Sequence, residues 1–229
     1  MNGDELEARI KTLESQVRIL QDIEDIKKLQ RAYGFYLEHW MTSEVIDLFS
    51  DGPDVALEWP EGKYFGKEGV KRYFEGNDKK DPEFLHQLMQ LSPVVDVDPD
   101  GKTAKGRWYC WGAITVPVGG GVIPSFQSGL YENEYVKEDG KWKIKRFRWH
   151  MNYSVKPGEG LVAPERIAAA DPKAKIMGGT KPDVPDTRFE HRYPSGYIFP
   201  FHYNHPVTSK PTSEGRRNLS VKGVKKAIR

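Results

Sequence analysis

The chain has 229 residues, 30% of them charged and 38% hydrophobic, and its 35 basic side chains nearly balance 33 acidic ones. The formal net charge of +2 excludes a dedicated nucleic-acid-binding surface, because such a surface needs a concentrated basic field to displace the counterions of phosphate. No segment approaches the roughly 20 apolar residues that cross a bilayer, and the polar N-terminus does not have the features of a signal peptide. We therefore expect a cytoplasmic protein without nucleic-acid or membrane partners.

The cysteine content agrees with this compartment. Cys110 is the single cysteine, so no intrachain disulfide can form, as is usual for proteins of a reducing compartment. The length predicts one domain with additions, or two small domains.

The N-terminal segment, residues 1–21, predicts a helix with a narrow apolar stripe. Its apolar residues recur at intervals of four and three, which keeps them on one helix face; they are Leu6, Ile10, Leu13, Val17 and Leu20. The β-branched residues fall at heptad position a and the leucines at d, which favours a two-stranded coiled coil, although fewer than three heptads are short for independent stability. Two alternatives remain open: the helix pairs with another subunit, or it lies on its own domain.

A domain is expected over residues 22–153, and it begins with two helices. After Gln21 the apolar phase shifts to a broader face that includes Tyr33 and Tyr36, as expected of a helix covering a sheet. A second helix is predicted from Ser43, its N-cap, to just before the breaker Asp51-Gly52-Pro53.

The rest of this domain reads mainly as strands. A short strand over 54–59 ends in a turn, and a helix follows over 67–75. Four long segments rich in aromatic and β-branched residues then predict an antiparallel meander with glycine-containing turns; they are 86–98, 103–116, 125–137 and 142–153. Helices followed by strands predict an α+β fold, in which the helices gather against one face of a strongly curved sheet.

The C-terminal extension, residues 154–229, predicts an irregular arm. Its prolines are too dense for a long helix or a sheet interior, yet its aromatic residues between Phe189 and Tyr203 are too many for a solvated tail. We expect the arm from Ser154 to Lys210 to pack over a pocket mouth or a subunit interface, and residues 214–229 to form a solvated end.

The order of these features resembles a known family. The similarity covers about residues 22–153 and is carried by the phrases DIKKLQRAYGFYLEHW, VALEWPEGKYFGKEGVKRYF, LHQLMQLSPVVDVDPDGKTAKGRWY and YENEYVKEDGKWKIKRFRW. They resemble the SnoaL-like branch of the nuclear transport factor 2 superfamily, which includes scytalone dehydratase, ketosteroid isomerase and polyketide cyclases. The resemblance implies a cone-shaped α+β barrel with a deep pocket, a homo-oligomer (dimer or trimer), and no metal or organic cofactor.

Two tyrosines and a carboxylate of the first long helix are candidate catalytic or binding residues. Tyr33 and Tyr36 lie three residues apart on its apolar face, so both hydroxyls point inward and need partners. The resemblance favours Tyr33 as the residue that polarises the substrate, and packing in the core is the alternative for both. Glu38 stands where the family usually has Asp, and with a pKa raised by burial it accepts a proton or orients a histidine; the alternative is a solvated helix residue.

Two strand histidines are candidate acid–base residues. His86 begins the first long strand, where the resemblance places a catalytic histidine, and His150 lies near the end of the last strand. A neutral imidazole can take a proton from carbon or oxygen and return it to a leaving group. The alternative for each is a hydrogen-bonded core or rim residue.

Further residues are expected to bind the substrate. Alternation places Arg107, Tyr109 and Trp111 on one face of their strand, and we expect Tyr131 and Asn133 to point inward, because the opposite register would bury two glutamates. Arg107 clamps an anion or pairs with an acidic neighbour. The abundance of aromatic residues, Trp59 among them, suits an aromatic ligand, although this superfamily is aromatic throughout.

The sequence therefore predicts a cofactor-independent lyase for a hydrophobic, aromatic, hydroxylated small molecule. The resemblance implies dehydration, or C–C cleavage that releases formaldehyde from a lignin-derived diaryl compound. An isomerase or hydrolase for a polycyclic substrate and a non-catalytic binding module are the alternatives. His202 and His205 lack further ligands at metal-binding spacing, so no metal site is expected.

Overall fold

The structure is a computed structural model, and it describes residues 2–60, 62–78, 84–118, 121–157 and 204–211. Within these residues the helices are α1 (Gly3–Glu38), α2 (Thr42–Asp47) and α3 (Gly66–Gly76). The strands are β1 (Ala56–Trp59), β2 (Gly62–Phe65), β3 (Leu85–Val97), β4 (Thr103–Val118), β5 (Gly121–Glu138) and β6 (Lys141–Val155).

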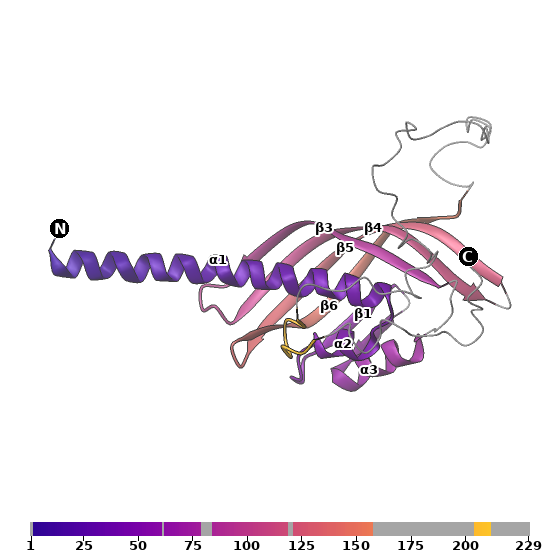
Figure 1. The fold of residues 1–229 in the computed structure, drawn as a ribbon, viewed down its shortest axis with the longest axis horizontal. Helices are drawn as coiled ribbons and strands as arrows, with labels where there is room; N and C mark the ends of the chain where they lie inside the picture. The colour runs from indigo at the N-terminus through magenta and orange to yellow at the C-terminus, as the bar shows by residue number, and fades with distance from the viewer. Residues whose placement is uncertain (1, 61, 79–83, 119–120, 158–203, 212–229) are drawn as a thin grey trace, which may run out of the picture.

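The six strands form one curved, unclosed sheet in the order β2-β1-β6-β5-β4-β3. The long strands β3 to β6 form the expected antiparallel meander, while β1 pairs with β6 in parallel. Figure 1 shows the long strands side by side, with α1 lying along the sheet and α2 and α3 near β1. The α+β fold predicted from the sequence is confirmed, with one parallel pair in an otherwise antiparallel sheet.

Helix α1 is continuous where the sequence suggested a boundary. Its N-terminus has a capping box, in which Asn2 Oδ1 accepts from the Glu5 backbone N–H at 2.8 Å and Glu5 Oε2 accepts from the Asn2 backbone N–H at 2.9 Å. No proline or glycine interrupts the chain from Asp4 to Tyr33. The shift of phase after Gln21 therefore marks the point where the helix meets the sheet, and the two predicted helices are one.

Two local expectations differ from the structure. Helix α2 begins at Thr42 with Met41 as its N-cap and no side-chain capping bond, so Ser43 lies inside the helix. The hairpin partner β2 was not expected, because its four residues are too few for a periodic pattern.

The inward faces of β4 and β5 form much of the core. Trp108, Cys110 and Tyr131 are fully buried and Asn133 is 2% exposed, which confirms the predicted orientation of β5. A buried hydrogen-bond network joins these strands to α1: Gln30 Oε1 accepts from Asn133 Nδ2 and from the Tyr135 hydroxyl, both at 2.9 Å. Since each buried polar group needs a partner, this network fixes the position of α1 on the sheet.

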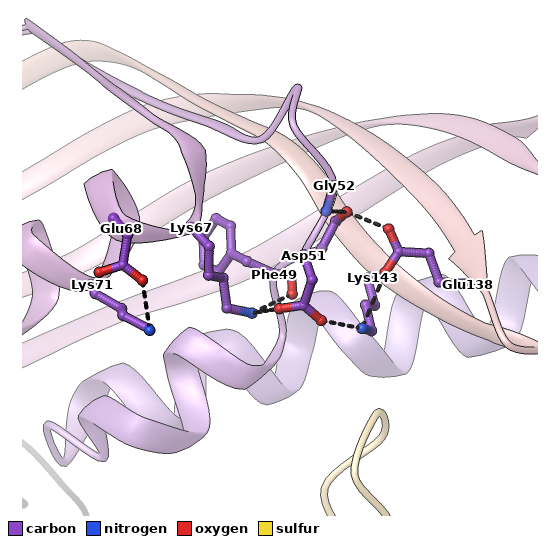
Figure 2. Close-up of polar contacts among 9 residues, drawn as sticks. Phe49, Asp51, Gly52, Lys67, Glu68, Lys71, Glu138 and Lys143 are labelled. Atoms are coloured by element: carbon purple, nitrogen blue, oxygen red, sulfur yellow. Dashed lines mark hydrogen bonds and ion pairs between the residues drawn. The ribbon is translucent and has the colours of Figure 1, made fainter.

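A polar network outside the core fixes the loop after α2 (Figure 2). Lys67 Nζ of α3 donates to the Phe49 carbonyl at 2.7 Å and pairs with Asp51 at 3.1 Å. Lys143 Nζ of β6 bridges Asp51 at 2.8 Å and Glu138 at 3.1 Å. The loop is thereby tied to both α3 and β6, and we assign this network a structural role.

Residues 204–211 pack on the helices. His205 is 2% exposed, its ring stacks on Tyr36 at a centroid distance of 5.4 Å, and Nε2 lies 2.8 Å from the Glu44 carbonyl. Its Nδ1 accepts from the backbone N–H groups of Val207 and Thr208, both at 3.1 Å. This part of the predicted arm packs on α1 and α2, while its aromatic stretch 189–203 lies outside the described residues.

Candidate functional site

A cavity of about 230 Å³ lies between the helices and the sheet. Residues from the end of α1, from α3 and from strands β1 and β3 to β6 line it, and its walls are mainly aromatic. The aromatic lining residues are Trp40, Trp59, Tyr73, Phe74, Phe84 and Trp149. Such a cavity, flat-walled and apolar with few polar groups, fits an aromatic small molecule.

His86 is the histidine of this lining and the candidate acid–base residue. It begins β3, and its ring lies near Trp40 and Phe84, with centroid distances of 6.1 and 6.3 Å. Its Nδ1 is enclosed and makes no hydrogen bond among the described residues, which leaves Nε2 as the nitrogen that can face a ligand. Burial lowers the pKa of His86 to about 4, because the apolar surroundings disfavour the imidazolium. His86 is therefore neutral at physiological pH and can accept a proton.

Two side-chain amides are among the other polar groups of the cavity lining, which also includes Tyr73. Asn77 Nδ2 donates to the Tyr73 carbonyl at 2.8 Å, and Gln127 Nε2 donates to Ser125 Oγ at 3.2 Å. Their amide carbonyl oxygens can accept a hydrogen bond from a substrate hydroxyl. The cavity thus combines one base with two groups that can orient a hydroxylated ligand.

The predicted catalytic tyrosine lies behind the cavity wall. Tyr33 is fully buried, packs on Phe147 with a centroid distance of 4.5 Å, and does not line the cavity. Burial raises the pKa of the Tyr33 hydroxyl well above its usual value, and burial likewise raises that of Tyr131, whose ring lies 6.3 Å away. The hydroxyl of Tyr33 makes no hydrogen bond among the described residues. Tyr33, Tyr131 and Tyr36 belong to the core around the site.

Glu38 and His86 line different hollows of the molecule. Glu38 lines a separate groove of about 370 Å³ between α1 and β3, where Oε1 accepts from Gln87 Nε2 at 3.3 Å. Burial raises the pKa of this carboxyl. Gln87 follows His86 on β3, and adjacent residues of a strand face opposite ways. The hydrogen-bond partner of Glu38 among the described residues is thus Gln87 and not His86.

Four other predicted site residues lie away from the cavity. Arg107 forms an ion pair with Glu132, while Tyr109 and Trp111 are 54% and 44% exposed. The cause is strand alternation, since Trp108 and Cys110 take the inward positions of β4. His150 is exposed and lines a hollow at the sheet edge beside Glu58 and Arg148.

The remaining predicted residues divide between cavity and core. Trp59 lines the cavity as expected. Asn133 is occupied by the buried network and by the Arg148 backbone N–H, which donates to Oδ1 at 3.1 Å. Sequence reasoning missed Trp149 and Gln127, although alternation around His150 and Tyr131 could have indicated both. It also missed Trp40, whose backbone has a φ of 45°, a turn that no pattern announces.

Metal-ligand clusters and membrane-spanning helices are both absent from the described ranges. No group of three or more His, Cys, Asp or Glu side chains that could hold a metal ion occurs in that part of the chain. None of the helices described here is long and apolar enough to cross a membrane.

Comparison with known proteins agrees with this fold. A protein named for scytalone dehydratase, from Novosphingobium aromaticivorans DSM 12444, matches 67% of this chain and 99% of its own, with a TM-score of 0.51 and 19% identity. LinA matches 66% of this chain and 99% of its own, with a TM-score of 0.53 and 17% identity. The hexachlorocyclohexane dehydrochlorinase LinA-type3 from Novosphingobium barchaimii LL02 matches 65% and 99%, with a TM-score of 0.52 and 18% identity.

Since their sequence identities with this chain are 17–19%, these matches show a shared fold. A model of the SnoaL-like domain matches residues 18–148, which is more than half of the chain. The sequence pattern, the curved sheet with a cavity beneath the helices and this match agree, and the protein belongs to the SnoaL-like family.

Proposed function

We propose that the protein is a cofactor-independent lyase that acts on a hydrophobic, aromatic, hydroxylated small molecule, with His86 as its acid–base residue. The observation that carries this proposal is a neutral histidine in the wall of an aromatic cavity. The names of the structural neighbours, which include a dehydratase and a dehydrochlorinase, support an elimination in general terms.

The proposed dehydration uses His86 twice. Nε2 removes a proton from the carbon next to the one that bears the hydroxyl, a C=C bond forms, and the C–O bond breaks. The imidazolium returns the proton to the departing oxygen, so that water leaves and His86 is again neutral. The low pKa of His86 makes the imidazolium a strong acid in this second step.

Cleavage of a C–C bond is the second candidate, and the same histidine can perform it. His86 removes the proton of a hydroxymethyl group, the C–C bond breaks, formaldehyde leaves, and the resulting carbanion takes the proton back. The aromatic walls of the cavity support this candidate because the two rings of a diaryl substrate would pack against them. A lignin-derived diaryl alcohol is therefore included among the test compounds.

The test is incubation of the protein with a panel of hydroxylated diaryl and polycyclic compounds, followed by mass spectrometry. Loss of the mass of water supports dehydration, and loss of the mass of formaldehyde supports C–C cleavage. An unchanged mass with a new retention time would indicate an isomerase, and gain of water a hydrolase. Binding without any conversion would indicate a carrier and contradict the proposal.

The pH dependence of kcat/KM should follow the neutral form of His86. Because the pKa of His86 is lowered to about 4, the base is unprotonated from pH 7 down to about pH 5, and activity should fall only as the pH approaches 4. Circular dichroism over the same range separates this effect from unfolding. An acidic limb near 6.5, the usual value for histidine, would place the base elsewhere.

Activity should survive removal of divalent metals. The motivation is that the proposed chemistry needs only proton transfer, and that the described part of the chain lacks a cluster of metal ligands. Turnover is measured before and after dialysis against a chelator. A loss of activity that a divalent metal restores would contradict a metal-independent reaction.

A further inference from the structure

The N-terminal half of α1 presents an apolar surface to solvent. We call its residues the N-terminal stripe: Leu6, Ile10, Leu13, Val17 and Leu20, each between 46% and 63% exposed. No described residue covers them. Figure 1 shows this half of α1 extending beyond the sheet, and a helix of 36 residues is roughly 54 Å long.

The N-terminal stripe faces away from the sheet on which α1 packs, so the sheet does not cover it. At about 100° per residue, the stripe points roughly 180° away from the face of α1 that packs on the sheet through Ile26, Leu29 and Tyr33. The helix is unbroken between the two regions, so it cannot turn the stripe onto the sheet. The described helices and sheet therefore do not supply its partner.

We propose that the N-terminal stripe pairs with the stripe of a second copy of this chain in a parallel, in-register, two-stranded coiled coil. Ile10 and Val17 at position a with leucines at position d are the combination that favours two parallel strands. The helix is already formed and capped, so pairing does not bear the cost of helix nucleation that limits short coiled coils.

Charge complementarity selects the parallel arrangement. In a parallel pair, position g of one helix faces position e of the next heptad on the other helix, which places Arg9 opposite Glu14 and the amide of Gln16 opposite Gln21. An antiparallel pair centred between Leu13 and Val17, in which position a faces position d, would instead place Glu14 beside Glu14 of the other copy. Only the parallel register joins opposite charges.

A second, separate apolar patch lies in the groove beside Glu38, and the charged residues Glu24, Lys28 and Arg31 stand between it and the N-terminal stripe on the same side of α1. Phe35 projects from α1 on the same side as the N-terminal stripe and is 49% exposed, and Met89 and Leu91 of β3 are 40% and 39% exposed. Paired α1 helices would bring these surfaces of the two domains near one another.

Disulfide trapping of the full chain tests direction and register. Leu6→Cys alone and Leu20→Cys alone should each form a covalent dimer under mild oxidation, because equivalent positions meet in a parallel coil. The wild type is the control, since its single cysteine, Cys110, is buried. Failure of both cross-links, with one that forms instead in a mixture of Ile10→Cys and Leu20→Cys, would indicate an antiparallel pair and overturn the proposal.

Sedimentation equilibrium tests the need for the stripe. The wild type should be a dimer, Leu13→Glu should raise its dissociation constant by at least tenfold, and Ala8→Glu, on the opposite helix face, should not. Helix content by circular dichroism verifies that both variants fold. A monomeric wild type, as expected if another part of the chain covers the stripe, or a wild-type trimer would contradict the two-stranded pair.

A charge-reversal cycle tests the predicted contact of Arg9 with Glu14. Arg9→Glu and Glu14→Arg should each weaken the dimer, since each places like charges across the interface, and the double variant should restore it. The two residues are five apart in one helix and therefore are not neighbours within it. Additive weakening in the double variant would overturn the in-register assignment.

Discussion

Replacing His86 by Asn should lower turnover by about 10²- to 10⁴-fold, the range that a general acid–base residue contributes. Asn is polar and smaller than the imidazole, so it limits the change in the cavity wall, but it cannot accept and return a proton. The measurement is kcat at saturating concentration of the compound that the panel identifies. Thermal unfolding of the variant verifies that the fold is kept.

The matched controls are Gln87→Ala and His150→Gln. Gln87 follows His86 on β3 but lines the groove on the other side, and His150 is an exposed histidine outside the cavity. Both variants should keep most of the wild-type turnover. Full turnover in His86→Asn, or an equal loss in all three variants, would remove His86 from the proposed mechanism.

Gly112→Ala should destabilise the protein by about 1–3 kcal/mol or more and lower activity as well. A Cβ added at Gly112 would lie 1.6 Å from the Gln87 carbonyl oxygen and 2.7 Å from the Gln87 carbonyl carbon. Both atoms belong to the backbone of the adjacent strand, so β3 must move away from β4 just beside His86. The measurements are denaturant unfolding and turnover.

Gly76→Ala is the control for this substitution. Gly76 is the last residue of α3, and an added Cβ there meets no atom within 4 Å. Its stability should be unchanged or slightly increased, since alanine has the higher helix propensity. Equal stability of the two variants would mean that β3 accommodates the methyl group, and the close approach at Gly112 would then not restrain His86.

The sequence predicted the parts of the fold that have a clear period. The four long strands agree within a few residues with the structure, and the inward orientation of Tyr131 and Asn133 follows from the cost of burying glutamates. A period gives the face of an element but not the position of the element it contacts. For this reason the sequence could not show that Glu38 accepts a hydrogen bond from Gln87 and not from His86.

The cavity itself depends on irregular backbone as well as on periodic elements. Trp40 reaches the cavity through a turn with positive φ, and Trp149 lies beside the histidine that attracted attention in the sequence. Tyr33 has the expected inward direction, yet Phe74 and Phe147 pack against it and hold it behind the wall. The direction of a side chain can be predicted from one strand or helix, whereas its distance from the cavity depends on every side chain packed between the two.

Residues 204–211 hold the chain on the domain at a second point after β6. One end is held by β6, which ends at Val155, and the other by His205 on α1 and α2. Holding two points about 50 residues apart in the chain costs roughly 3 kcal/mol of chain entropy. Burial of Val207, about 2 kcal/mol, does not offset this cost alone, so the three hydrogen bonds of the His205 ring and its stacking on Tyr36 are needed as well. The His205 ring therefore attaches residues 204–211 to α1 and α2, in addition to the attachment at the end of β6.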